Sequence, residues 1–202
     1  MTVARRLWLV RHGETTGQSS IRFHGSNDVP LSDAGRAQIR ALAPLLAGVS
    51  FARVVHSPLV RAAESARLLA TICDVPMARL AADDRLREIS FGRCEGMTEE
   101  EIAAAFPEFW RDYRARTVDT FPGGENRTAF AARVRAAILE HAASAWAGDL
   151  LVVAHRGTVR QALRALLGVA PGQHDAFGVE LASVSTVRDE PPWRLEALGL
   201  LP

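Results

Sequence analysis

Two histidines follow short apolar runs, and each has a glycine within two residues. His12 comes after residues 7–10 and Arg11, and His155 comes directly after residues 149–154. Apolar runs of this length are typical of strands that are buried on both faces of a parallel sheet. Because ligands bind beyond the carboxyl ends of such strands, we expect both histidines at a ligand site rather than in surface turns.

Two arginines and a glutamate complete a set of residues that suits phosphoryl chemistry. Arg11 adjoins His12, Arg61 opens the helix expected after the second strand, and Glu88 precedes a glycine-punctuated loop. Guanidinium groups offer paired N–H donors to phosphate oxygens, and each hydrogen bond to a charged group is worth about 1.5–3 kcal/mol. Since parallel strands end at one edge of a sheet, these side chains are expected to converge.

The pattern predicts a nucleophilic histidine. His12 is expected to be uncharged at neutral pH, because neighbouring arginines disfavour the imidazolium. Its attack on phosphorus would give a phosphohistidine, with Arg11, Arg61 and a protonated His155 stabilising the transferring group. A substrate anion would favour the protonated form of Glu88, which could protonate the leaving alkoxide and later deprotonate water. This scheme needs no metal ion or other cofactor.

Length and composition predict one globular domain over residues 1–202, with 48% hydrophobic and 23% charged residues. The 24 Lys+Arg and 23 Asp+Glu leave a formal net charge of +1, so neither nucleic acid nor a membrane surface is an expected partner. Cys73 and Cys94 are too few for a disulfide framework. No signal-peptide pattern or long apolar run is present, so we expect a cytoplasmic protein.

The spacing of apolar residues predicts alternating strands and helices, and hence an α/β fold with a parallel sheet. Strands are expected at residues 7–10, 51–56 and 149–154, with a short strand between 76 and 88 and two weaker, antiparallel strands near 181–187 and 193–200. Helices are expected at residues 34–46, 59–72, 127–146 and about 158–167. Residues 98–116 should form two short helices that separate at Phe106-Pro107.

These motifs, in this order and spacing, resemble the histidine phosphatase superfamily, whose members have the phosphoglycerate mutase-like fold. The resemblance runs from about residue 7 to residue 165. It is carried by Arg11-His12-Gly13-Glu14-Thr15, Arg22, Gly25, Asp28-Val29-Pro30-Leu31, Gly35, Gln38, Ser57-Pro58-Leu59, Arg61-Ala62, Glu88, Phe91-Gly92, Glu95-Gly96, Gly123-Gly124-Glu125 and Val153-Ala154-His155.

The resemblance implies a three-layer α/β sandwich, with a mainly parallel central sheet and helices on both faces. It also implies that His12 is the nucleophile, that Arg11, Arg61 and His155 form the phosphate pocket, and that Glu88 is the proton donor. Glu95 and Glu125 lie in nearby loops and are alternatives for the acid.

The activity implied is metal-independent hydrolysis of a small phosphate ester. The short segment between Glu88 and Gly123 resembles the phosphatase branch, and the compact chain resembles the α-ribazole phosphatases. A phosphoglycerate mutase and a non-catalytic protein that binds phospho-ligands are the alternatives. A metallohydrolase is disfavoured, because the histidines lack the spacing of a helical ligand pair. Homodimers are common among relatives, so a homodimer is a further expectation.

Three places depart from the family pattern. Gly17-Gln18 stands where members commonly have Trp-Asn, of which the Asn contacts the phosphate. His24 stands where glutamine is frequent, and Arg156 where glycine is frequent after the second histidine. We expect these departures to retune substrate choice. The substrate-binding set predicted from the sequence is Gln18, Arg22, His24, Gly25 and Arg156.

The aromatic residues Phe106, Phe109, Trp110 and Tyr113 have the spacing of a helix face that packs into a core. The alternative is that the segment forms a lid over the site.

Overall fold

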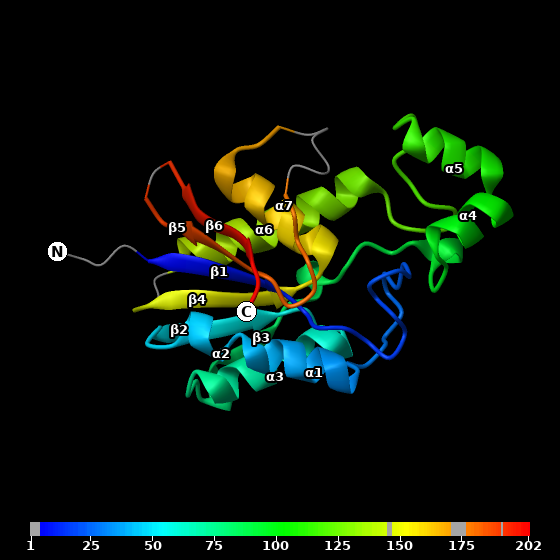
Figure 1. The fold of residues 1–202 in the computed structure, drawn as a ribbon. Coiled ribbons are helices and arrows are strands. Elements are labelled where there is room, and N and C mark those ends of the chain that lie inside the picture. The colour runs from blue at the N-terminus through cyan, green and yellow to red at the C-terminus, as the bar shows by residue number, and fades with distance from the viewer. Residues whose placement is uncertain (1–4, 145–146, 171–176, 191) are drawn as a thin grey trace.

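The computed structural model describes residues 5–144, 147–170, 177–190 and 192–202. Its centre is a six-stranded sheet with the strand order β3-β2-β4-β1-β5-β6 (Figure 1). The strands are β1 (Arg6–Arg11), β2 (Phe51–His56), β3 (Leu80–Ala82), β4 (Asp149–Ala154), β5 (Val184–Arg188) and β6 (Arg194–Leu200). Strands β1 to β4 pair in parallel, whereas β5 and β6 join in antiparallel orientation. The predicted mixture of strand directions is therefore confirmed.

Helices cover both faces of the sheet (Figure 1). On one face lie α6 (Arg127–Ala143) and α7 (Arg156–Leu167), and on the other α1 (Asp33–Ala41), α2 (Ala43–Leu46) and α3 (Val60–Ile72). Successive strand residues point to opposite faces of the sheet. Leu9 and Val152 belong to the core under α6 and α7, and Val10 and Val153 belong to the core under α1–α3. This double burial explains the unbroken apolar runs and confirms the expected three-layer sandwich.

A helical pair stands beyond the carboxyl ends of the parallel strands (Figure 1). It consists of α4 (Glu99–Ala105) and α5 (Pro107–Arg114), which separate at Phe106 as predicted. Helix α4 begins with a capping box between Thr98 and Glu101. The predicted aromatic residues pack around a third core of Cys94, Ile102 and Phe121, so the core interpretation is confirmed. Short 3-10 helices occur at Met77–Arg79, Asp84–Leu86 and Gly92–Cys94.

Three of the predicted helices differ from the observed ones by more than one residue. The helix expected over residues 34–46 is divided into α1 and α2, because Pro44 lacks an N–H and its ring crowds the preceding turn. Helix α7 begins at Arg156, since the His155 carbonyl already accepts from the Val159 N–H at 2.8 Å. Helix α6 ends at Ala143, and the last residues predicted for it, 145–146, lie outside the described residues.

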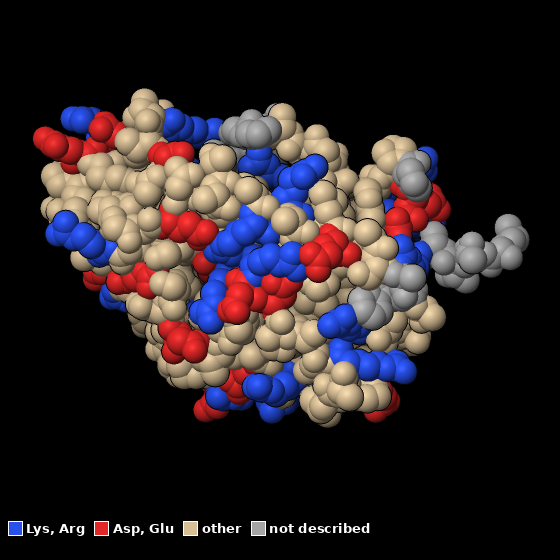
Figure 2. All heavy atoms as spheres, turned by 180° about the vertical axis from the view of Figure 1, so that it is seen from behind, with Lys and Arg blue, Asp and Glu red and all other residues tan. Residues whose placement is uncertain are grey.

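Two features bear on the expected partners. Among the described residues, none of the helices combines the length and the apolar composition needed to cross a bilayer. On the face shown in Figure 2, acidic and basic side chains are interspersed rather than gathered into a field of one sign.

Candidate active site

The register of β1 and β4 brings His12 and His155 together. Arg11 pairs with Ala154 across the two strands, so the next residue of each chain segment is a histidine at the same edge of the sheet. The His12 N–H donates to the Ala154 carbonyl at 3.0 Å, and the two imidazole centroids are 5.1 Å apart. The predicted convergence of these two residues is confirmed.

Arg61 joins them from the first turn of α3. Its side chain is only 1% exposed and donates from Nε to Nδ1 of His155 at 3.2 Å. Its terminal nitrogens donate to the carbonyls of Gly25 and Asn27, each at 2.7 Å. Arg61 therefore links the second histidine to the loop that follows β1. Each of its terminal nitrogens carries a second N–H, which can donate to a phosphate oxygen.

The hydrogen bonds decide which nitrogen of each histidine carries a proton. In His12, Nδ1 lies 2.7 Å from the Gly13 carbonyl, which can only accept, so Nδ1 carries the proton and Nε2 has the lone pair. In His155, Nδ1 accepts from Arg61, and Nε2–H donates to the Ser57 hydroxyl at 2.7 Å.

Burial and neighbouring cations keep both histidines neutral in the ligand-free protein. Burial lowers the pKa of His12 and of His155 well below the ordinary histidine value, and Arg61 lowers both further. The protonated His155 expected during phosphoryl transfer is therefore not its state in the ligand-free protein, because the imidazole is buried and a guanidinium already donates to its Nδ1. Burial, followed by the charge of Arg156, lowers the pKa of Arg11 to about 10, which leaves Arg11 protonated at neutral pH.

Glu88 faces the same space from the segment after β3. One carboxylate oxygen accepts from the Ile89 N–H at 3.0 Å, and the other accepts from the Gly157 N–H in the first turn of α7 at 2.9 Å. The alternative acids are engaged elsewhere: Glu95 binds Ser26 among other partners, and Glu125 forms an ion pair with Arg133. The geometry favours Glu88 among the three carboxylates.

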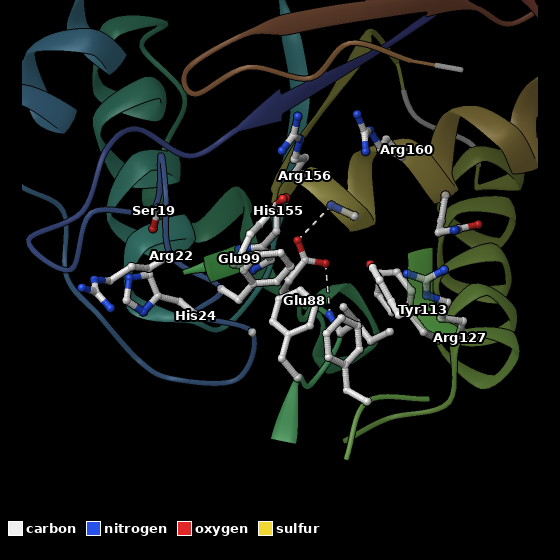
Figure 3. Close-up of a pocket in the computed structure, with 18 of the residues that line it drawn as sticks. Ser19, Arg22, His24, Glu88, Glu99, Tyr113, Arg127, His155, Arg156 and Arg160 are labelled. Carbon is white, nitrogen blue, oxygen red and sulfur yellow. Dashed lines mark hydrogen bonds between the residues drawn. The ribbon is translucent and has the colours of Figure 1, made fainter. Parts of the chain in front are cut away.

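These residues line a cavity of about 920 Å³, whose wall also includes residues of α4, α5 and α6 (Figure 3). All five residues predicted to be catalytic are in its wall: Arg11, His12, Arg61, Glu88 and His155. Four of the five predicted substrate-binding residues also line it: Arg22, His24, Gly25 and Arg156.

Gln18 is the predicted residue that the structure does not place in the cavity wall. It is exposed, and its backbone lies in the left-handed region, with φ 61°. The turn is closed by hydrogen bonds from the Gln18 N–H to Thr15 and from the Ile21 and Arg22 N–H groups to the Gln18 carbonyl. Gln18 therefore shapes the loop through its backbone rather than through its side chain.

Two of the departures from the family pattern are in contact with one another. The His24 imidazole, which lines the cavity, lies 2.6 Å from the Gly17 carbonyl through Nε2. A Cβ at position 17 would lie 2.6 Å from the His24 ring and 2.9 Å from Val29, which is closer than side chains pack. The absence of a side chain at Gly17 is thus what allows the His24 ring to occupy this part of the wall.

The sequence did not identify several cavity residues on helices. Arg160 follows Arg156 by one turn of α7, and Arg127 and Tyr113 form another part of the wall, where the Arg127 guanidinium lies 4.3 Å from the centre of the Tyr113 ring (Figure 3). The i, i+4 spacing of Arg156 and Arg160 directly after His155 was an available signal, because such residues share a helix face. Within the described part of the chain, no group of three or more His, Cys, Asp or Glu residues could hold a metal ion.

Comparison with known proteins agrees with this geometry. The model of the histidine phosphatase superfamily (branch 1) matches residues 7–199. A 2,3-bisphosphoglycerate-dependent phosphoglycerate mutase 2 of Gloeobacter violaceus is 34% identical, and the match covers 86% of this chain and 81% of that protein. A glucosyl-3-phosphoglycerate phosphatase of Mycolicibacterium vanbaalenii is also 34% identical, over 95% and 93% of the two chains.

The fold is similar to solved structures as well. The α-ribazole phosphatase of Shigella flexneri superposes with a TM-score of 0.82 at 27% identity, over 96% of each chain. The family model spans nearly the whole chain, and relatives named as phosphatases align with most of it. The chain therefore belongs to branch 1 of the histidine phosphatase superfamily and is a phosphoric monoester hydrolase.

Proposed function

We propose that this protein hydrolyses a small phosphorylated metabolite through a phosphohistidine on His12, without a metal ion. The observation that carries the proposal is the hydrogen bond of His12 Nδ1 to Gly13, since it leaves the Nε2 lone pair available in a cavity that Arg11 and Arg61 also line. A buried neutral imidazole beside two guanidinium groups suits attack on a phosphate dianion.

In the first step, Nε2 of His12 forms a bond to phosphorus while the bond from phosphorus to the ester oxygen breaks. Protonated Glu88 gives its proton to that oxygen, and the alcohol leaves. In the second step, Glu88 takes a proton from water as the water oxygen attacks phosphorus, and the P–N bond breaks to release phosphate and His12. Arg11 and Arg61 stabilise the equatorial oxygens throughout. The phosphate charge also favours protonation of His155, which adds a further cation once substrate is bound.

α-Ribazole phosphate is our first candidate substrate. Similarity to the Shigella flexneri enzyme supports it, as does a cavity far larger than a phosphoryl group. A phosphoglycerate mutase is the second candidate, which the relative from Gloeobacter violaceus favours. A mutase must shield its phosphohistidine from water, whereas the outer wall of this cavity includes exposed residues such as Glu99 and Asp119.

A panel of phosphomonoesters tests the proposal. It includes α-ribazole phosphate, sugar phosphates and 3-phosphoglycerate, each assayed with and without a strong chelator. We expect phosphate release that the chelator does not change, with one ester preferred. Conversion of 3-phosphoglycerate to 2-phosphoglycerate without phosphate release would favour the mutase instead, and chelator-sensitive turnover would contradict the metal-free scheme.

A further inference from the structure

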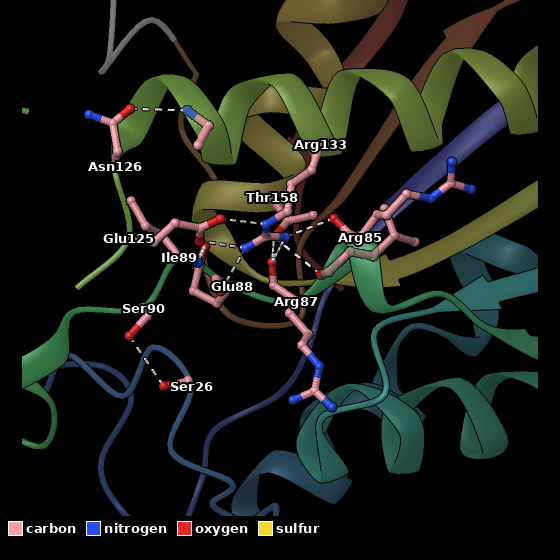
Figure 4. Close-up of polar contacts among 12 residues, drawn as sticks. Ser26, Arg85, Arg87, Glu88, Ile89, Ser90, Glu125, Asn126, Arg133 and Thr158 are labelled. Carbon is pink, nitrogen blue, oxygen red and sulfur yellow. Dashed lines mark hydrogen bonds and ion pairs between the residues drawn. The ribbon is translucent and has the colours of Figure 1, made fainter. Parts of the chain in front are cut away.

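The segment that carries Glu88 has little regular structure of its own. It leaves the 3-10 helix Asp84–Leu86 at Arg87, and residues 88–90 belong to neither a helix nor a strand. The carbonyls of Arg85, Arg87 and Glu88 point toward α6, where one side chain donates hydrogen bonds to all three (Figure 4). Backbone groups of a half-buried loop need such partners, because an unpaired polar group is costly.

That side chain is Arg133, in the second turn of α6. Nη1 donates to the carbonyls of Arg85 and Arg87 at 2.8 Å each, and Nη2 donates to the Glu88 carbonyl at 3.1 Å. Nε and Nη2 each donate to one carboxylate oxygen of Glu125 at 2.7 Å. These five contacts match the five N–H donors of a guanidinium, an arrangement that lysine cannot reproduce.

Helix α7 holds the same segment from the other side. The Thr158 hydroxyl lies 3.2 Å from the Arg87 carbonyl, and the Gly157 N–H donates to the Glu88 carboxylate at 2.9 Å. A Cβ on Gly157 would lie 2.4 Å from that carboxylate, so the backbone approaches it as closely as glycine allows. Arg133 thus fixes the main chain of Glu88, and α7 fixes its carboxylate.

We propose that Arg133, oriented by its ion pair with Glu125, is a positioning residue for Glu88 as the acid of the first step. Arg133 is not in the cavity wall, so it acts through Glu88 rather than on the substrate. The inference rests on the proposed function, in which Glu88 protonates the leaving oxygen. An acid displaced by a fraction of an ångström loses much of its effect, since proton transfer requires hydrogen-bond contact.

The dependence of rate on the leaving group separates positioning from general damage. An alkyl phosphate needs a proton on its leaving oxygen, whereas p-nitrophenolate leaves without one. The quantity to compare is kcat/KM for glycerol 3-phosphate and for p-nitrophenyl phosphate, because kcat/KM reports formation of the phosphohistidine. Glu88→Gln should lower the alkyl value by about 100-fold or more and the aryl value far less.

Arg133→Gln should show the same selectivity with a smaller loss, about 10- to 100-fold on the alkyl ester, and Arg133→Lys should lie between it and the parent. Combining Arg133→Gln with Glu88→Gln should add no further loss, because both act through one group. Arg36→Gln is the matched control: it removes another half-buried arginine that pairs with a carboxylate, Glu64, and it should leave both rates unchanged.

Equal losses on both esters in the Arg133 variants, or an additive loss in the double variant, would overturn the positioning role. If Arg133→Gln does not fold, as judged by circular dichroism, Arg133→Lys and Glu125→Gln carry the same test. If Glu88→Gln itself shows no selectivity between the esters, the assignment of Glu88 in the proposed function fails, and the positioning role fails with it.

Discussion

The inner and outer ends of the cavity are built differently. At the inner end, His12, Arg61 and His155 are each at most 3% exposed and come from strand ends and the first turn of α3. Each is held by hydrogen bonds to the main chain or to another member of the site. At the outer end, Glu100 and Asp119 are exposed and come from the first turn of α4 and a loop.

This difference separates chemistry from substrate choice. Buried groups with fixed partners keep one geometry, which phosphoryl transfer requires. Exposed groups on short helices and loops can change without disturbing the sheet. Changes at the inner end should therefore affect every substrate alike, and changes further out should affect substrates unequally.

His12→Ala should have the largest effect. Loss of the nucleophile should lower kcat/KM at least about a thousandfold on every phosphomonoester, measured as phosphate release. His56→Ala is the matched control: His56 also ends a strand, with Nδ1 2.8 Å from the next carbonyl, but it is not in the cavity wall. Loss that varies among substrates would break the division between the two ends. Normal turnover would exclude His12 as the nucleophile, and absence of turnover in the parent as well would support a non-catalytic protein.

His155→Asn tests the electrostatics of the inner end through stability. The pKa of His155 lies below its unfolded value, so the unfolded chain binds more protons as pH falls below about 6.5, and the fold loses stability in that range. As the pH falls below about 6.5, the unfolding free energy of the variant should decrease less steeply than that of the parent. The difference between the two slopes should be up to about 1.4 kcal/mol per pH unit. Denaturant melts between pH 5 and 7 measure this, and parallel slopes in parent and variant would contradict it.

Gly17→Ala tests the contact between Gly17 and His24, nearer the outer end. The added methyl should displace the His24 ring and change KM by about tenfold for larger metabolite esters, with kcat on p-nitrophenyl phosphate little changed. Gly178→Ala is the control, because nothing lies within 4 Å of a Cβ there. A uniform loss on all esters would assign this loop to the chemistry instead.

The smallest effect concerns the possible lid. If α4 and α5 close over substrate, orthovanadate should slow amide exchange across residues 99–114, by up to about tenfold. Mass spectrometry of exchanged peptides measures this, with residues 60–72 of α3 as the internal comparison. Unchanged exchange at 99–114 under saturating vanadate would leave the pair as a static wall.

The sequence predicted the inner end better than the outer end, for a physical reason. Strands buried on both faces produce apolar runs, and the residues that end them must meet at one sheet edge, so His12 and His155 were found. The neutral state of His155 depends on its burial and on a contact with Arg61, neither of which spacing encodes. Arg160 was missed although its i, i+4 spacing from Arg156 was an available signal, because packing decides which face of a helix lines a cavity. The prediction that Gln18 binds substrate differs from the structure, because the left-handed backbone of Gln18 directs its side chain away from the cavity wall.

Trapping the phosphoenzyme shows whether His12 is the nucleophile. Glu88→Gln should slow release of the phosphoryl group, so brief incubation with p-nitrophenyl phosphate and an alkaline quench should retain it for peptide mapping by mass spectrometry. We expect one phosphoryl group on His12, which nuclear magnetic resonance should locate on Nε2, and none when His12→Ala is added. A phosphoryl group on another residue, or on Nδ1 of His12, would contradict it.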